Sequence, residues 1–471
     1  MLTLSPSRYT LQVPLRGGRT LGYNGLSGGL AVWDADETAI FEAISSGAPV
    51  DPASRSAQAL LHGGYVVPQG VDELALVEEQ YLQHRFDTRS LVLTVAPTLS
   101  CNFGCDYCFQ GQDKPTGTMT PEVQDGLMAM VERFLPSLRR VHVAWYGGEP
   151  LLRLKVIEAL SDRLIARCAE AGVAYSAMMV SNGYRLTAEV ARSLVQRQVK
   201  TVQVTLDGGP GDHDRRRALL SGRPTFDRIV TNLQEVIDQT ELILSVRVNI
   251  DHRNAERIPA LLEHLAAAGL GNRGRLGVYF APVEAMTSGC HTVEDVCMTK
   301  TGYGQLEVEL LRQAFALGLA SLPRPPRFRG TCAAIRPRGY VILPSGDVHK
   351  CWDTVSFPER AVGSIFDLDA LARGDRMRQW LSWSPLDNAA CRSCRILPNC
   401  AGSCAYKFVH AEDTRGEAAS LPCPSWKYNI KERLLLRAEK SGVIGPEDIP
   451  DDVAPTDPAE LCVDTVPAAA K

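Results

Sequence analysis

Alternation of hydrophobic and polar residues near the start of the chain predicts a β-hairpin followed by two short helices. Residues 9–14 alternate as a strand does, Gly17 and Gly18 suit a turn, and residues 20–23 return as the second strand. Helical spacing of apolar residues covers 36–44 and 53–61. We expect residues 1–85 to form a small α+β module, and the simplest interpretation is an extension that packs on the next domain.

Strand and helix patterns then alternate through residues 90–285. The predicted strands are 91–96, 140–146, 175–180, 201–206, 242–250 and 277–282, and each one except the last precedes a helical pattern. Repeated strand–helix units predict a parallel sheet, here an α/β fold in the form of an open or partial (β/α)6 barrel. Functional residues of such sheets lie at the carboxyl ends of the strands.

Periodic structure is sparse in the last third of the chain. Residues 286–329 are interpreted as a linker with one helix at 304–321. Residues 330–440 are turn-rich and cysteine-rich, which is typical of a domain held together by metal centres. Residues 441–471 are rich in Pro, Asp and Ala and are predicted to be a mobile tail.

Composition excludes several classes of protein. The 471 residues are 45% hydrophobic and 22% charged, as in ordinary globular proteins, and the net charge of -4 argues against binding to nucleic acid or to an anionic membrane. No apolar run reaches the roughly 18 residues of a membrane-spanning helix. Residues 1–8 lack the pattern of a signal peptide, so we expect a cytoplasmic protein.

Fourteen cysteines are the most informative feature of the composition, and they are clustered. Cys101, Cys105 and Cys108 lie within eight residues, directly after the first predicted strand of the sheet. Clustered thiolates are typical of zinc or iron–sulfur sites. Three thiolates suit a 4Fe–4S cluster with one iron left for another ligand, and the alternative is a zinc ion that takes a distant fourth ligand.

The spacing Cys101-x3-Cys105-x2-Cys108 resembles the signature of radical S-adenosylmethionine (radical SAM) enzymes, and the resemblance extends over about residues 90–430. It implies a reduced 4Fe–4S cluster that cleaves SAM to methionine and a 5'-deoxyadenosyl radical, which removes a hydrogen atom from the substrate. Gly147-Gly148-Glu149 resembles the family's GGE motif, which meets the amino group of SAM. Glycines allow a close backbone approach and a carboxylate suits an ammonium, although an ordinary strand-to-helix turn is the alternative.

Further SAM contacts are implied by the same resemblance. Thr205 and Arg217, twelve residues apart, match the residues that hold the carboxylate and ribose of SAM in related maturases. Asn182 ends the third strand and faces the same site. Tyr107 resembles the family's aromatic residue beside the adenine, with simple packing as the alternative.

Two neighbouring pairs of residues are less specific. Arg215 and Arg216 are explained equally well as a solvated basic turn. Arg247 and Asn249, on the fifth strand, are expected to reach the same pocket.

The second group of cysteines resembles the SPASM extension of radical SAM enzymes that modify peptides. By position, one auxiliary 4Fe–4S cluster would be distal and one proximal, giving three clusters in all. The distal ligands would be Cys391, Cys394, Cys400 and Cys423, and the proximal ligands Cys332, Cys351 and Cys404. A structural zinc ribbon is the alternative.

The chain departs from this pattern in two places. No second cysteine follows Cys332 closely, so the proximal cluster would have an open iron, a non-cysteine ligand, or a thiolate from Cys290 or Cys297. Sulfatase-maturing relatives have an Asp directly after the cysteine that matches Cys351, whereas here Asp353 comes one residue later and is a candidate proton acceptor. Cys168 is interpreted as a packing residue within a helix and Cys462 as incidental.

These features together predict a maturase that abstracts a hydrogen atom from a ribosomally synthesised precursor peptide. Two auxiliary clusters favour net oxidation, so an oxidative crosslink (a C–C cyclophane or a thioether) is expected before epimerisation. The N-terminal module would recognise a leader peptide by strand addition. A flavodoxin or ferredoxin is the expected electron donor. The alternatives are an anaerobic sulfatase maturase that forms formylglycine and a non-catalytic zinc scaffold.

Overall fold

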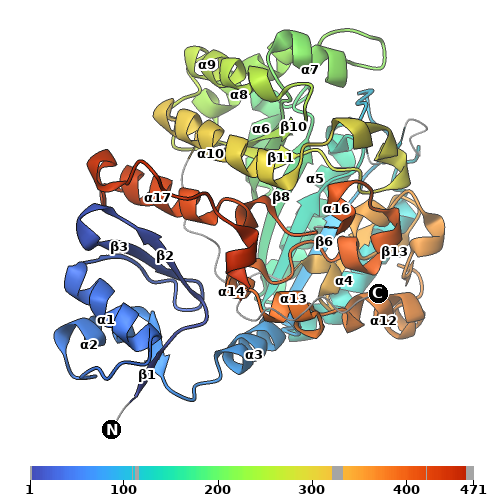
Figure 1. Cartoon of the computed structure of the whole chain (residues 1–471). Coiled ribbons are helices and arrows are strands. Elements are labelled where there is room, and N and C mark those ends of the chain that lie inside the picture. The colour runs from blue at the N-terminus through green and yellow to red at the C-terminus, as the bar shows by residue number, and fades with distance from the viewer. Residues whose placement is uncertain (1–2, 109, 112–115, 321–331, 421, 463–471) are drawn as a thin grey trace.

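The computed structural model describes residues 3–108, 110–111, 116–320, 332–420 and 422–462. Figure 1 shows an N-terminal module in blue, a central sheet with its helices in cyan to yellow, and a C-terminal part in orange and red. Within the described residues, none of the helices is both long enough and apolar enough to cross a membrane.

The N-terminal module is built as the hydrophobic pattern predicts. The predicted hairpin is confirmed, because β2 (Thr10–Pro14) pairs antiparallel with β3 (Thr20–Asn24), and β4 (Leu30–Trp33) adds a third strand. A separate pair joins β1 (Leu4–Pro6) to β5 (Val66–Pro68). The helices are α1 (Ala35–Ser45), α2 (Arg55–Gly63) and α3 (Glu73–Arg85), and Asp34 begins α1 with a capping box.

This module packs on the C-terminal part of the chain. Leu11, Val13 and Leu21 of its sheet share a buried cluster with Leu434 and Leu435 of α17 (Ile430–Lys440). Figure 1 shows α17 in red beside the blue strands, although the two are separated by the whole central domain in sequence. Burial of these side chains supports the interpretation of the module as a packed extension.

The six predicted strands of the central sheet are confirmed. They are β6 (Ser90–Val95), β7 (Arg140–Trp145), β8 (Ala174–Ser181), β9 (Val199–Thr205), β10 (Ile243–Ile250) and β11 (Leu276–Pro282). All five pairings between consecutive strands are parallel. The helices between them are α4 (Pro121–Phe134), α5 (Leu154–Glu170), α6 (Ala188–Gln196), α7 (Pro210–Arg217), α8 (Phe226–Gln239) and α9 (Ile258–Ala267), and α10 (Lys300–Ala316) follows β11.

The C-terminal part extends this sheet instead of forming a layer of its own. Strand β12 (Gly339–Ile342) pairs parallel with β6, and β13 (Asp347–His349) and β14 (Gly363–Ser364) continue antiparallel. The result is a nine-stranded sheet, whose two edges among the described residues are β11 and β14. The remaining helices are short: α11 (Leu368–Arg373), α12 (Asp375–Ser382), α13 (Ala389–Arg392), α14 (Leu397–Cys400), α15 (Tyr406–Val409) and α16 (Glu417–Ser420).

Residues 441–462, predicted as part of a mobile tail, are packed against the rest of the chain. Ile444 and Leu461 are buried in the cluster that joins α17 to the N-terminal sheet. Cys462 pairs with Cys394 through an isolated antiparallel bridge, so it is not an incidental residue of a free tail. Residues 463–471 lie outside the described part.

Candidate functional site

A cavity of ≈ 650 Å³ opens at the carboxyl ends of the parallel strands. Cys101, Cys105 and Cys108 line it, as do Cys404 and Cys423 of the C-terminal part. None of the fourteen cysteines, all of which lie within the described residues, forms a disulfide. One cavity therefore brings together members of all three predicted cysteine groups.

The loop of the first three cysteines is held by backbone contacts. Phe103 is fully buried and forms an isolated antiparallel β-bridge with Leu219. The Gly104 N–H donates to the Ala218 carbonyl at 3.1 Å. Gly148 lies beneath the start of the loop, where a Cβ would come within 2.3 Å of the carbonyl oxygens of Leu99 and Ser100. Only glycine allows this approach, so Gly148 positions the cysteine loop and also lines the cavity with Gly147.

Glu149 has a different environment from its neighbours. Its side chain is fully buried, and its carboxylate accepts hydrogen bonds from the N–H of Leu151 (3.0 Å), the hydroxyl of Ser181 (3.0 Å) and the N–H of Asn182 (2.7 Å). Burial raises its pKa, and these hydrogen bonds oppose the rise. Glu149 thus fixes the ends of β7 and β8, and its contact with the amino group of SAM stays a prediction.

Tyr107 is the centre of a polar network at the ends of β9 and β10. Its hydroxyl donates to the buried Asp207 carboxylate and accepts from Arg217 and from the Asn249 amide (3.2 Å). Asp207 also accepts the Asn249 N–H at 3.1 Å and lies 3.8 Å from Arg217. Burial raises the pKa of Tyr107, so the phenol stays protonated. No role is predicted for Asp207 from the sequence, although its place two residues after β9 could have suggested one.

Other predicted contacts reach the same cavity. Thr205, Asn182 and Arg217 line it, and so do Arg247 and Asn249, which confirms the placement expected for the fifth strand.

The two arginines of the neighbouring basic turn differ in how exposed their side chains are. Arg215 is solvated, since 74% of its side chain is exposed. A solvated role is wrong for Arg216, whose side chain is 6% exposed and lies 2.9 Å from the fully buried Asp251.

The four predicted distal cysteines lie close to one another. Burial is the first cause of the raised pKa of the Cys391 and Cys400 thiols, and the neighbouring cysteines add to it. Burial lowers the pKa of Lys427, but thiolates led by Cys423 outweigh this and raise it overall. A cation among four soft donors fits an anionic thiolate-bound cluster.

The three predicted proximal cysteines also converge. Asp353 and the other two thiols raise the pKa of Cys351, after burial as the first cause. The Cys351 thiol donates to Asp353 at 3.6 Å, and burial raises the pKa of that carboxyl. This donor set of thiols and one carboxylate is suited to iron.

A buried group of one carboxylate and two lysines on the cavity wall was not predicted from the sequence. Glu284, which follows β11, accepts from Lys300 at the start of α10 and from Lys407 of α15 at 2.8 Å. Both lysine side chains are only 6% exposed, so the group ties the barrel strands to the C-terminal part.

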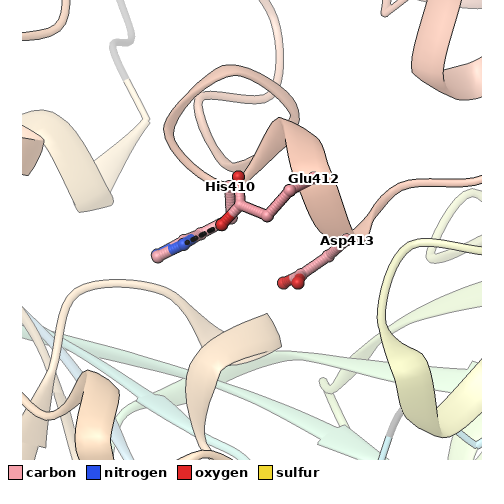
Figure 2. Close-up of side chains that lie close together, drawn as sticks. All are labelled: His410, Glu412 and Asp413. Atoms are coloured by element: carbon pink, nitrogen blue, oxygen red, sulfur yellow. Dashed lines mark hydrogen bonds and ion pairs between the residues drawn. The ribbon is translucent and has the colours of Figure 1, made fainter.

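His410, Glu412 and Asp413 form a histidine–carboxylate cluster elsewhere (Figure 2). The Asp413 carboxylate is already held by Arg360 and by the Tyr406 hydroxyl. The Arg360 hydrogen bond is also the main reason why the pKa of Asp413 is lowered. These contacts account for the position of the Asp413 carboxylate, which links two turns of the chain.

Comparison with known proteins assigns the class of chemistry. Residues 95–265 match the Radical SAM superfamily. This stretch, which holds the first three cysteines, is a radical SAM domain, and the protein is accordingly an enzyme that uses SAM with a 4Fe–4S cluster.

Three characterised proteins are similar to the chain in sequence. The chain is 22% identical over 335 residues to the serine-type anaerobic sulfatase-maturating enzyme of Klebsiella aerogenes, a match that covers 67% of this chain and 80% of the relative. It is 25% identical over 343 residues to mycofactocin maturase MftC of Mycobacterium tuberculosis, covering 68% and 79%. A GTP 3',8-cyclase of Synechococcus is 28% identical over 150 residues, which is 31% of this chain and only 42% of that relative.

A solved structure shares the fold. Native anSMEcpe with bound AdoMet and the Cp18Cys peptide aligns with a TM-score of 0.56 and 17% identity, over 75% of this chain and 98% of that one.

Proposed function

We propose that the protein is a radical SAM maturase that acts on a ribosomally synthesised precursor peptide and installs an oxidative crosslink, either C–C or thioether. The observation that carries the proposal is the shared cavity, which Cys101, Cys105 and Cys108 line together with Cys404 and Cys423. A substrate in this cavity would lie between the radical source and an electron acceptor. Two relatives over most of the chain are named as maturases, which supports a peptide substrate.

When bound, SAM and the reduced cluster would supply the radical that removes a hydrogen atom from the substrate. Cys101, Cys105 and Cys108 would hold the cluster, and Gly147 and Gly148 would admit SAM close to the backbone. Tyr107 and Arg217, fixed by Asp207, would position the nucleoside and carboxylate of SAM. The strand and loop walls of the cavity would exclude water from the reacting carbon.

In the C-terminal part, we propose two auxiliary 4Fe–4S clusters in a SPASM arrangement. The distal ligands are Cys391, Cys394, Cys400 and Cys423, and the proximal group contains Cys332, Cys351 and Cys404. A second electron must leave the substrate when a crosslink forms, and these clusters would accept it. A flavodoxin or ferredoxin would supply the first electron.

The N-terminal module would bind the leader of the precursor. Within the described residues β4 pairs only with β3, so its other edge offers backbone N–H and C=O groups to an added strand. The experiment is deletion of residues 1–85, which should weaken precursor binding while SAM cleavage continues. Unchanged precursor affinity would leave the module with its packing role alone.

The chemistry is tested with the Cys105→Ala variant and a candidate precursor. The reduced wild-type enzyme should release 5'-deoxyadenosine and lower the peptide mass by about two hydrogens, as expected for an oxidation that the cofactor drives. The variant should do neither. Deoxyadenosine release by Cys105→Ala would refute the assignment of the cluster ligands.

The match to a sulfatase-maturating enzyme over 67% of the chain favours formylglycine formation as a second candidate function. Incubation with a sulfatase peptide distinguishes the two, because conversion of its Ser or Cys to an aldehyde would replace the crosslink proposal.

A further inference from the structure

We infer that the carboxylate of Asp353 is the fourth protein ligand of the proximal cluster, beside Cys332, Cys351 and Cys404. This inference rests on the proposed function, which places a 4Fe–4S cluster there. It concerns the fourth coordination position of that cluster, for which the chain has no second cysteine after Cys332.

The Asp353 carboxylate lies beside one of the proposed ligands. Asp353 lies two residues after Cys351, and its Oδ2 is 3.6 Å from the Cys351 sulfur. It lines the same cavity as Cys404.

In the described part of the chain, no ion pair joins the Asp353 carboxylate to a Lys or Arg side chain. Its hydrogen bond comes from the Cys351 thiol, a weak donor, and Arg247 and Lys407 act on it only as more distant charges. A buried carboxylate without a paired cation is costly, and coordination to iron would remove that cost.

The turn that carries Asp353 is fixed by the contacts of its two neighbours. Thr354 donates to the Cys351 carbonyl at 2.8 Å and contacts His349 at 2.9 Å. Trp352 packs edge-on against Tyr146 with ring centroids 4.1 Å apart. Asp353, between these two anchored residues, is therefore held beside Cys351.

The two other sulfurs considered for this position are held by nearby carbonyls. The Cys290 thiol donates to the Thr287 carbonyl at 3.3 Å, in a cluster that includes Tyr107 on the SAM side of the cavity. The Cys297 thiol donates to the Val293 carbonyl at 3.2 Å. Both are engaged within their own turn, which leaves Asp353 as the donor next to the proximal cysteines.

The experiment uses the full chain with Cys101, Cys105 and Cys108 changed to Ala, so that only auxiliary clusters contribute. This parent, reconstituted anaerobically, should bind about eight irons, four for each cluster. Asp353→Ala is compared with Asp353→Cys and with the control Asp347→Ala, a residue of β13 that contacts Ser345. The readouts are iron and sulfide content, Mössbauer and EPR spectra after dithionite reduction, and the midpoint potentials.

Asp353→Ala should change the spectrum and potential of one cluster, or release about four irons, while the other cluster is unchanged. Asp353→Cys should restore about eight irons with an all-thiolate spectrum, which a merely structural role would not produce. Asp347→Ala should match the parent. Identical spectra and potentials in Asp353→Ala and the parent would overturn the inference alone and leave Asp353 as the proton acceptor. A parent with zinc or about four irons would overturn the two-cluster part of the proposed function as well.

Discussion

Replacement of Asp207 by Asn tests how the SAM site is organised. The Tyr107 hydroxyl uses its hydrogen on Asp207 and both lone pairs on Arg217 and Asn249, while the other Asp207 oxygen accepts the Asn249 N–H. An Asn side chain has one oxygen and one NH2 group, so it cannot accept from both. One buried donor is left without an acceptor in either orientation.

The cost can be worked out from these contacts. An unsatisfied buried donor costs about 1–3 kcal/mol. Arg217, 3.8 Å from Asp207, also loses a counter-charge, which is worth up to roughly 4 kcal/mol at an effective dielectric constant of about 20. Part of the counter-charge remains, because Cys105 also acts on Arg217. We expect the affinity for SAM to fall about 10- to 100-fold, or about 1.4–2.8 kcal/mol.

Anaerobic calorimetry with SAM measures this effect on the reconstituted enzyme. The matched control is Asp212→Asn, which weakens the partly exposed pairs with Arg257 and Arg215 and should change SAM affinity by less than twofold, since such pairs contribute about 0–1 kcal/mol. Iron content should equal that of the wild type in both variants. Wild-type SAM affinity in Asp207→Asn would show that the network does not position Arg217.

Three further predictions concern the supports of the site. Gly148→Ala should abolish SAM binding, because the new methyl group would clash with the carbonyls of Leu99 and Ser100; calorimetry that shows wild-type affinity would contradict this. His213 is fully buried and its pKa is held well below its usual value, chiefly by burial, so stability should decrease as the pH falls below about 6.5, by about 1.4 kcal/mol per pH unit. Denaturation of His213→Gln between pH 7.5 and 5.5 should show a shallower loss, and an equal loss would exclude this histidine as a cause. Leu434→Ala should weaken the contact between α17 and the N-terminal sheet by about 2–5 kcal/mol, seen as faster proteolytic release of residues 1–85; an unchanged cleavage rate would argue against that contact.

The strands of the central sheet could be predicted because their apolar residues recur with a clear period and each is followed by a helix. The grouping of the cysteines could be proposed from the sequence too, because their spacing along the chain limits which thiols can lie close together. By contrast, β12 is a four-residue strand whose pairing with β6 depends on residues far away in sequence, and no local pattern records such a partner. The Glu284 group is similar, because Lys300 and Lys407 converge on it only through tertiary packing.

The pairing of β12 with β6 also orders events during synthesis. Leu93 of β6 pairs with Tyr340 of β12, which is synthesised much later. One side of β6 therefore remains an open edge until most of the chain has left the ribosome. The loop with Cys101 follows β6 directly and stays accessible from that side for the same period. Under the proposed function, iron and sulfide would reach this loop most easily in that interval, before the C-terminal strands cover the edge.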